Sequence, residues 1–280
     1  MTRPCQNVGQ RSLTPTRISS RHLSLTRGVD FPLRMLTSLA AVLTTACLVL
    51  QSLASPASGR QSSKRQDSGT PIPPLQDPWY SAPDGFESAK PGDVLRIREA
   101  PGNLTSLASN CSAAYNILYR TTNSQYKPDW AVTTVFVPVA DSAAALLSYQ
   151  IPYDSAWLDA SPSYALYTSD GTRSLLDIST GLSSGWFVNV PDYEGPLASF
   201  TAGVQSGHAT IDSIRATFNA NETLGLYVNA RYALWGYSGG ALASEWAAEL
   251  AVQYAPEVSF RVFDLHSSWN TFSHTDPRVL

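Results

Sequence analysis

Apolar residues in the middle of the chain either alternate with polar ones or run together, and both patterns predict β-strands. Residues 112–121 place aromatic and apolar side chains at every second position, which is typical of a half-buried strand. Residues 131–139 are β-branched and predict a second strand, a candidate edge strand because it contains Pro138. The continuous apolar run of residues 143–150 predicts a strand buried on both faces.

Further along the chain the period changes, and helices alternate with strands. Apolar residues recur at helical spacing over 202–219, which predicts a helix with His208 on its more polar side. A second helix is predicted over 239–254, and strands are predicted over 185–191 and 231–236. Strands that alternate with helices indicate an α/β fold with a mainly parallel, helix-covered sheet.

Two consequences follow for the organisation of the domain. Residues 77–99 are punctuated by proline and glycine and predict an extended arm that leads into the sheet. In a parallel, helix-covered sheet, ligands bind at the carboxyl ends of the strands. We therefore expect the functional site in the loops that follow the strands ending at residues 150 and 236.

The second of these loops contains a nucleophile-elbow pattern. Ser238 lies between Gly236 and Gly240, directly after a predicted strand and before a predicted helix, which is the G-x-S-x-G arrangement. This tight turn would expose the serine hydroxyl above the sheet for attack on an acyl carbonyl. The backbone N–H of Gly239, in the first turn of the helix, would stabilise the negative charge of a tetrahedral intermediate. A five-residue match with two glycines also occurs by chance, so the alternative is an ordinary strand-to-helix loop.

A second oxyanion donor is expected in the loop at residues 150–155. Asp154 follows the buried strand at the same edge of the sheet, and its backbone amide or side chain is the candidate donor. The alternative is that Asp154 only caps a turn, a common role of aspartate.

Composition limits the classes of partner. The chain has 280 residues, enough for one large α/β domain, and a formal net charge of −3. The pI is about 5.8, and no block of Lys or Arg follows the first third of the chain. We therefore expect no nucleic-acid partner. Seven Trp and 13 Tyr suit apolar ligands, but core packing explains most aromatic residues.

The N-terminal part of the chain predicts secretion. Residues 35–54 carry an apolar core shorter than a bilayer span and end in Ser52-Leu53-Ala54, a small-x-small pattern that indicates a cleaved signal peptide. A membrane anchor is the alternative. Residues 1–34 are rich in Arg, Ser and Thr and could be a transit peptide, but a translation start at Met35 explains them more simply, as an upstream misannotation or leader.

Processing and glycosylation signals agree with this location. Residues 55–70 are polar and predict a disordered propeptide, in which the pair Lys64-Arg65 is a site for a dibasic protease. Three sequons are glycosylation candidates, at Asn103, Asn110 and Asn221. Cys5 and Cys47 lie in segments expected to be removed, so Cys111 would be the lone cysteine of the mature chain.

Seven separated motifs together resemble the fungal secretory lipases of the lipase A type. The resemblance extends from about Trp79 to Glu257, within a domain over 71–257, and its motifs lie at residues 148–155, 162–164, 185–186, 191–195, 211–215, 235–240 and 254–257. It implies an α/β-hydrolase fold, secretion, no cofactor, and hydrolysis of triacylglycerols and related esters. It also implies that Ser238 is the nucleophile and that Asp154 and Gly239 form the oxyanion site. Asp192 and Glu194 lie in a loop typical of the family, and we expect them to support the elbow.

The chain departs from the family after the elbow helix. An α/β-hydrolase supplies its triad in the order Ser, then Asp or Glu, then His, and family members continue for well over a hundred residues beyond the serine. Only 42 residues follow Ser238, and residues 258–280 do not resemble the family. We therefore expect the last strands, the lid, and the Asp and His of the triad to be missing. The family also often pairs a cysteine near Cys111 with one beyond this chain's end.

The tail offers residue types that could replace the missing pair. Asp264 with His266, or His274 with Asp276, would need to reach hydrogen-bond distance of the serine. A segment just after the elbow helix emerges at the amino-terminal end of the strands, so we do not expect either pair to reach it. His22 and His208 are no better placed, and all four histidines are expected at the solvated surface.

The sequence therefore predicts a secreted triacylglycerol lipase or carboxylesterase, inactive as written because the triad Asp and His are absent. Its expected partner is a lipid ester at a lipid–water interface, with no cofactor, no metal, no nucleic acid and no stable membrane anchor. The alternatives are a non-catalytic lipase-like protein that binds lipid, and a serine peptidase on the same fold.

Overall fold

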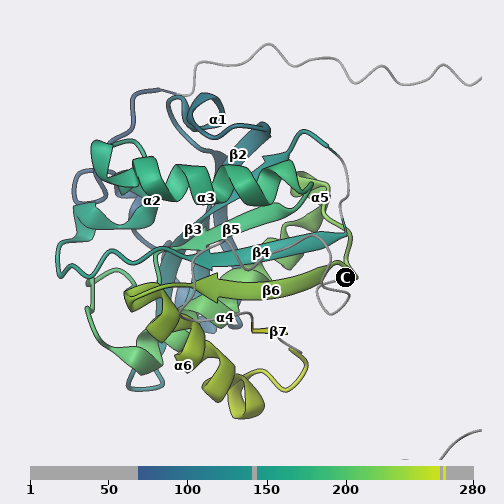
Figure 1. Ribbon diagram of the computed structural model, residues 1–280. Coiled ribbons are helices and arrows are strands. Elements are labelled where there is room, and N and C mark those ends of the chain that lie inside the picture. Colours follow the sequence, from purple (N-terminus) through teal and green to yellow (C-terminus); the bar gives the residue numbers. More distant parts are fainter. Residues whose placement is uncertain (1–68, 141–143, 259–260, 263–280) are drawn as a thin grey trace, which may run out of the picture. The chain divides into compact units, whose positions relative to one another are not determined.

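The computed structural model describes residues 69–140, 144–258 and 261–262 of this chain, and these residues build one sheet with helices on both faces (Figure 1). In the described residues the sheet has seven strands in the order β1-β2-β3-β5-β4-β6-β7. The strands are β1 Val94–Glu99, β2 Cys111–Thr122, β3 Pro128–Pro138, β4 Ala145–Gln150, β5 Phe187–Pro191, β6 Arg231–Gly236 and β7 Arg261–Val262.

The sheet is mixed, with an antiparallel and a parallel half. β1, β2, β3 and β5 pair antiparallel in that order, whereas β5, β4, β6 and β7 pair parallel. β3 is therefore an interior strand, and the expectation of an edge strand was wrong. Pro138 is tolerated there because it is the last residue of β3 and pairs with Cys111, the first residue of β2, where the ladder begins.

Helices cover the two faces of the sheet unequally. α3 lies along one face, and α4 and α6 lie on the other (Figure 1). The helices are α1 Leu104–Leu107, α2 Pro162–Ala165, α3 Thr172–Ser183, α4 Gly203–Asn219, α5 Asn221–Leu224 and α6 Gly239–Tyr254. Short 3-10 turns lie at η1 Pro78–Tyr80, η2 Phe86–Ser88, η3 Leu158–Ala160 and η4 Ser169–Gly171.

The alternation of side chains along β3 divides the core into two clusters. Val135 points to the face covered by α4 and packs in one cluster with Ile214, whereas Phe136 points to the other face and packs in a cluster with Ile178 of α3. All four side chains are at most 1% exposed. Burial of side chains of this size contributes roughly 1.5–3 kcal/mol each to folding.

Most elements predicted from the pattern are present. The helix predicted over 239–254 is α6, and that predicted over 202–219 is α4 with one residue fewer at its start. The arm predicted over 77–99 is extended only in part, because Pro78–Tyr80 and Phe86–Ser88 form 3-10 turns, and its last six residues form β1. α3 was not predicted.

His208 does not lie at the solvated surface, so that expectation was wrong. Its side chain is fully buried on α4, its Nδ1 lies 3.1 Å from the carbonyl oxygen of Thr122, and its ring lies 4.0 Å from the ring of Tyr254. α4 is buried by the sheet on one side and by α6 on another, so even its polar positions face the interior. Burial lowers the pKa of His208.

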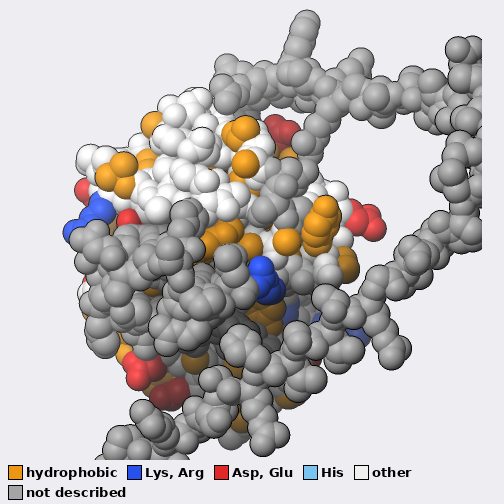
Figure 2. Space-filling model, turned by 45° about the vertical axis from the view of Figure 1, so that its right-hand side comes forward, with side chains coloured by type: hydrophobic (Ala, Val, Ile, Leu, Met, Phe, Trp, Pro, Cys, Tyr) orange, Lys and Arg blue, Asp and Glu red, His pale blue; other side chains and the backbone are white. Residues whose placement is uncertain are grey.

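The described surface bears on several expectations about processing. Asn103 and Asn110 are exposed and Asn221 is half-buried, so glycosylation at the three sequons stays a prediction. The expected leader over 1–34, the signal peptide over 35–54 and the dibasic pair lie outside the described residues. Among the residues that the structure describes, no helix is long and apolar enough to cross a membrane. On the face shown in Figure 2 the described surface is mostly uncharged, with hydrophobic side chains in separate patches.

A buried amide joins three strands to a helix at the centre of the sheet. Asn189 of β5 is fully buried, and its Oδ1 accepts hydrogen bonds from Thr133 of β3 and Thr217 of α4. Its Nδ2 donates to the hydroxyls of Ser148 on β4 and Ser213 on α4. All four hydrogen-bonding positions of the amide are therefore satisfied.

Replacing Asn189 by alanine is expected to lower the free energy of unfolding by about 2–4 kcal/mol, because four buried hydroxyl groups lose their shared partner. Urea denaturation measures the change, and the exposed Asn229→Ala is the matched control, expected within about 0.5 kcal/mol of the parent. Equal midpoints for the two variants would show that the amide does not hold the elements together.

Candidate active site

The turn between β6 and α6 holds Ser238 in a strained conformation. Its φ is 53° and its ψ is −127°, a region that residues with a side chain seldom adopt and that costs on the order of 1–3 kcal/mol. Ser238 is exposed and is the N-cap residue of α6, whereas the preceding Gly236 is buried. The strain therefore places the hydroxyl at the surface, at the carboxyl end of β6.

Close backbone contacts explain the glycines around the serine. A Cβ atom on Gly240 would lie 1.9 Å from the carbonyl oxygen of Gln150, the last residue of β4. A Cβ atom on Gly239 would lie 1.9 Å from Oδ1 of Asp154. Gly240 therefore requires glycine, because the atom it would meet belongs to the backbone. A side chain at position 239 would instead force the Asp154 side chain to move. The first turn of α6 thus lies directly against the end of β4 and the loop that follows it.

Asp154 therefore lies beside the candidate nucleophile. It is exposed and has a φ of 37°, a second strained residue in the same site. The structure brings together Ser238, Gly239 and Asp154, the three residues that the sequence predicted for the nucleophile and the oxyanion site. The N-terminus of the 16-residue helix α6 adds the positive end of its dipole at this point.

The loop after β5 fixes the loop that carries Asp154. The hydroxyl of Tyr153 accepts a hydrogen bond of 2.8 Å from the backbone N–H of Glu194. The hydroxyl of Tyr193 donates to the carbonyl oxygen of Ile151 at 2.9 Å, and the rings of Tyr153 and Tyr193 pack 4.9 Å apart. These reciprocal contacts hold the Asp154 loop against the β5 loop. They are made by two tyrosines and by backbone groups, so the expected support of the elbow by Asp192 and Glu194 stays a prediction.

Two buried carboxyl groups lie in the same β5 loop. Asp192 is 4% exposed and accepts hydrogen bonds from the backbone N–H of Ser163 at 2.8 Å and from its hydroxyl at 2.5 Å. Burial raises the pKa of Asp192 to about 7 despite these bonds. Glu194 is 2% exposed, and its Oε2 has no hydrogen-bond partner among the described residues. Burial, followed by the charges of Asp154 and Asp192, raises the pKa of Glu194 to about 8.

A polar bridge beneath the elbow was not predicted from the sequence. The side-chain amide of Gln150 lies 2.7 Å from the hydroxyls of both Ser148 and Ser244, and all three residues are fully buried. Because Gln150 and Ser148 belong to β4 and Ser244 to α6, the bridge ties the helix to the strand. The signal for this bridge in the sequence was Gln150, a polar residue at the end of a mainly apolar strand.

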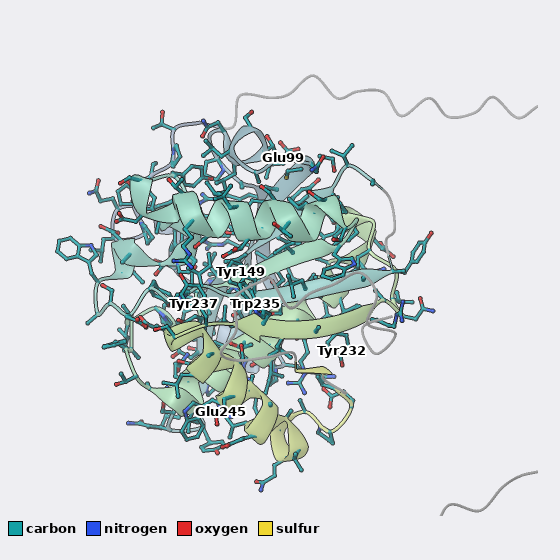
Figure 3. The ribbon with its side chains drawn as sticks, in the orientation of Figure 1. Glu99, Tyr149, Tyr232, Trp235, Tyr237 and Glu245 are labelled. Atoms are coloured by element: carbon teal, nitrogen blue, oxygen red, sulfur yellow. The ribbon has the colours of Figure 1, made fainter. Side chains whose placement is uncertain are left out.

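Aromatic side chains support the residue before the serine. Tyr149 of β4 and Trp235 of β6 pack with ring centroids 4.6 Å apart, and Tyr237 lies 6.3 Å from Trp235 (Figure 3). The guanidinium carbon of Arg173 lies 5.2 Å from the ring centroid of Tyr237. Tyr237 is therefore held between the strand ends and α3.

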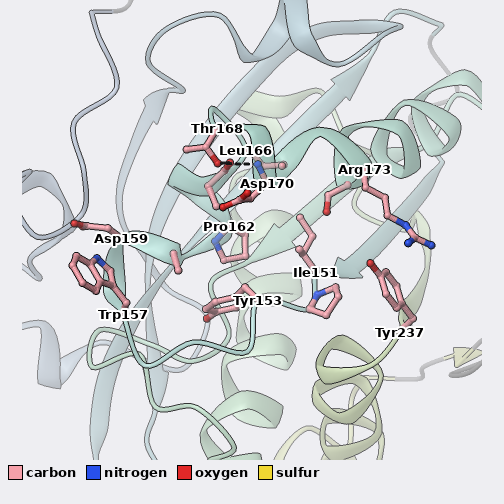
Figure 4. Close-up of a pocket in the computed structure, with 15 residues that line it drawn as sticks. Ile151, Tyr153, Trp157, Asp159, Pro162, Leu166, Thr168, Asp170, Arg173 and Tyr237 are labelled. Carbon is pink, nitrogen blue, oxygen red and sulfur yellow. Dashed lines mark hydrogen bonds between the residues drawn. The ribbon is translucent and has the colours of Figure 1, made fainter.

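Two cavities flank the serine. The larger, with a volume of about 470 Å³, is lined by Tyr237, Arg173, Trp157 and the apolar residues Ile151, Pro162 and Leu166, among others (Figure 4). The smaller, of about 20 Å³, is lined by Gly239, Asp154 and Glu194, with parts of α4 and α6. The loop that carries Asp154 contributes to both cavities and separates them.

No histidine in the described part of the chain is placed to act as the base for Ser238. His208 contacts Tyr254 at the far end of α6, about 24 Å along the helix axis from the serine. Asp264, Asp276, His22, His266 and His274 lie outside the described residues. Within the described residues, no group of three or more His, Cys, Asp or Glu side chains could hold a metal ion.

The remaining cysteine lies away from this site. Cys111 begins β2, and its Sγ donates to the carbonyl oxygen of Ala113 at 3.1 Å. The partner that the family resemblance implies would lie beyond residue 280, so a disulfide at Cys111 stays a prediction.

Comparisons with known proteins agree with this geometry. Residues 163–264 match the model of the secretory lipase family. The chain is 60% identical over 200 residues to the trichothecene C-3 esterase of Fusarium sporotrichioides, covering 68% of this chain and 44% of that protein. It is 41% identical over 202 residues to lipase A of Arthroderma benhamiae, covering 68% of this chain and 43% of that protein.

A solved lipase structure is also similar to this chain. The crystal structure of Candida antarctica lipase A in its closed state superposes with a TM-score of 0.62 at 34% identity, over 68% of this chain and 45% of that chain. The chain thus spans less than half the length of the relatives it matches. The family match also continues to residue 264, past Glu257 and through β7. The fold, the elbow and these relatives together place this chain in the secretory lipase family, with the α/β-hydrolase fold.

Proposed function

We propose that this domain hydrolyses lipid esters with Ser238 as the nucleophile. The observation that carries the proposal is the packing of Asp154 against Gly239, which puts an acidic side chain and the N-terminus of α6 beside a strained, exposed serine. Such a serine is positioned for acyl transfer, and the backbone N–H groups around it suit an oxyanion. The similarity to lipases and esterases supports the same activity.

The proposed reaction proceeds in two steps. The Ser238 hydroxyl oxygen attacks the ester carbonyl, and its proton passes to a base while the N–H of Gly239 and the Asp154 loop stabilise the oxyanion. The tetrahedral intermediate then expels the alkoxide, which takes the proton from the protonated base and leaves as the alcohol, and an acyl-serine remains. Water then hydrolyses the acyl-serine and releases the acid. The described residues supply the nucleophile and oxyanion site, but not the base or the acid that orients it.

Glu194 has a supporting role in this proposal. With a pKa of about 8, its carboxyl is neutral at pH 7 and adds no second negative charge beside Asp154 and the developing oxyanion. Asp192, with a pKa of about 7, is only partly ionised there. The neutral Glu194 carboxyl therefore limits the negative charge on the oxyanion side of the serine.

We also propose that the protein is secreted and acts at a lipid–water interface. The support is the apolar segment over residues 35–54 and the family to which the chain belongs. The proposed partner is a lipid ester, with no nucleic acid and no stable membrane anchor. A non-catalytic lipid-binding role and a peptidase on the same fold remain the alternatives.

A second candidate function is the removal of acyl groups from trichothecenes. It is favoured by sequence similarity, since the chain is 60% and 52% identical to two proteins described as trichothecene esterases, and 39–42% identical to six fungal lipases. Both candidate functions use the same serine and differ in the alcohol that leaves.

The role of Ser238 can be tested with a chimera. Residues 71–257 are joined to the part of the Fusarium sporotrichioides esterase that follows its matching region. This protein is expected to hydrolyse p-nitrophenyl acetate and to react with a fluorophosphonate probe. Ser238→Ala is expected to reduce hydrolysis by about 10³-fold or more and to abolish labelling, whereas the exposed Ser183→Ala has no effect.

The 280-residue polypeptide alone is expected to show neither activity nor labelling. Labelling of Ser238 in that polypeptide, lost in His266→Ala or His274→Ala, would instead show that its own tail provides the base. A chimera labelled equally in the Ser238→Ala variant would rule out this serine as the nucleophile.

The neutral state of Glu194 predicts a pH-dependent stability. Its folded pKa is raised above the unfolded value, so its contribution to stability is complete below about pH 4 and is lost as the pH rises to about 8. In this window the group makes the free energy of unfolding fall by up to about 1.4 kcal/mol per pH unit. Glu194→Gln should remove that dependence, and the exposed Glu249→Gln should retain it. Denaturation curves between pH 5 and 8.5 measure it, and parallel curves for Glu194→Gln and the parent would refute the raised pKa.

The two candidate functions predict different substrate preferences. If the trichothecene relationship reflects the substrate, the chimera should show a kcat/KM at least about tenfold higher for a trichothecene acetylated at C-3 than for an emulsified long-chain triacylglycerol. Release of acetate and of fatty acid measures the two rates. The opposite ratio would assign the protein to the lipases in the narrow sense.

A further inference from the structure

The two cavities beside Ser238 are divided by the serine's own neighbours. Tyr237, immediately before the serine, lines the larger cavity, and Gly239, immediately after it, lines the smaller one. The two ends of an ester bound at Ser238 therefore have different spaces available within the described residues. The smaller cavity has room for about one water molecule, so it can accept neither half of a lipid ester.

The larger cavity, called here the Arg173 cavity, is large enough for one half of the substrate. Its volume of about 470 Å³ falls within the usual range for small-molecule sites. Figure 4 shows Arg173 and Tyr237 at one end and Trp157 and Asp159 at the other, with Ile151 and Pro162 between them. Apolar and aromatic residues thus form much of its walls, and polar residues contribute the rest, namely Asp159, Thr168, Asp170, Arg173 and Ser174.

The polar groups of the Arg173 cavity distinguish between kinds of ligand. Among the described residues no carboxylate lies within ion-pair distance of Arg173, and its guanidinium carbon lies 5.2 Å from the ring centroid of Tyr237. Asp170, also exposed, provides an acceptor in the same cavity. An extended acyl chain would displace water from both groups without replacing its hydrogen bonds, which is unfavourable. A ring system with several oxygen atoms would replace them.

We propose that the Arg173 cavity binds the alcohol half of the ester, and that this half is a compact ring system bearing several oxygen atoms. The inference rests on the proposed role of Ser238, because the cavity can hold part of the ester only if the reacting serine lies beside it. Arg173 donates hydrogen bonds to ether or hydroxyl oxygens, and Trp157 and Tyr237 pack against the ring faces. The acyl half then extends away from the Arg173 cavity.

The test uses the 280-residue chain and two neutral probes of similar size. Isosorbide is a fused bicyclic ether diol, whereas 1-octanol is a flexible chain with one hydroxyl. The indole N–H resonance of Trp157 in ¹H–¹⁵N NMR spectra reports occupancy, since this side chain is 64% exposed and lines the cavity. Isosorbide is expected to bind saturably, with a dissociation constant in the millimolar range, and at least about fivefold more tightly than 1-octanol.

Variants locate the binding. Arg173→Ala is expected to weaken isosorbide binding at least about fivefold and to leave 1-octanol unaffected, whereas the exposed Arg231→Ala changes neither. Both arginines are exposed, so a general effect of charge or folding would appear in both variants. Tighter binding of 1-octanol than of isosorbide, or equal effects of the two arginine variants, would overturn the proposal.

The result is separable from the proposed function. Covalent labelling of Ser238 in the chimera, combined with isosorbide binding that Arg173→Ala does not alter, would reject the Arg173 cavity alone. Binding that depends on Arg173, combined with a chimera that is not labelled, would reject the nucleophile and leave a binding site without hydrolysis. Loss of both would reject both.

Discussion

The close approach of α6 to the end of β4 is the contact on which the rest of the site depends. Gly240 lies so near the carbonyl oxygen of Gln150 that no side chain could occupy its position. To bring the helix this close, the chain must turn within a few residues, and Ser238 takes the strained conformation that results. The Gln150 bridge to Ser244 then holds helix and strand together from below. Exposure of the serine is thus a consequence of packing in the layer beneath it.

The same contact determines where acidic groups can lie. Once α6 begins beside β4, the loop after β4 must pass its first turn, and Asp154 comes to rest on Gly239. The aromatic pair Tyr153 and Tyr193 fixes that loop to the next one, which carries Glu194. Burial of an unpartnered carboxyl is unfavourable when it is charged, so the fold accommodates Glu194 as a neutral group. Burial of the Glu194 carboxyl lowers the stability of the fold once the group ionises, and such local costs are typical of functional sites.

The sequence predicted the parts of the structure that follow from local pattern. The strands around residues 115, 135, 148, 188 and 234 and the helix over 239–254 have clear periods, and the elbow has fixed glycine spacing. The placement of His208 failed because its burial depends on two elements that pack against α4 from different sides. The interior position of β3 failed for a similar reason, since strand order is decided by long-range pairing. The polar Gln150 at the end of an apolar strand was a local signal, but its partner Ser244 was not, and the Arg173 cavity had none, because each joins residues from separate elements.

Substrate binding and proton transfer are separable in this architecture. The candidate nucleophile Ser238, the candidate oxyanion residues Asp154 and Gly239, and the Arg173 cavity lie at the ends of β4 and β6 and at α3 and α6. In the α/β-hydrolase order, the acid and the base follow the nucleophile in the chain, on loops of later strands. Under the proposals made above, the groups that contact the substrate and the groups that move its proton therefore come from different parts of the sheet. The shape and polarity of the cavity beside Tyr237 would then affect which ester binds, whereas the acid and the base would set the rate at which the serine is deprotonated.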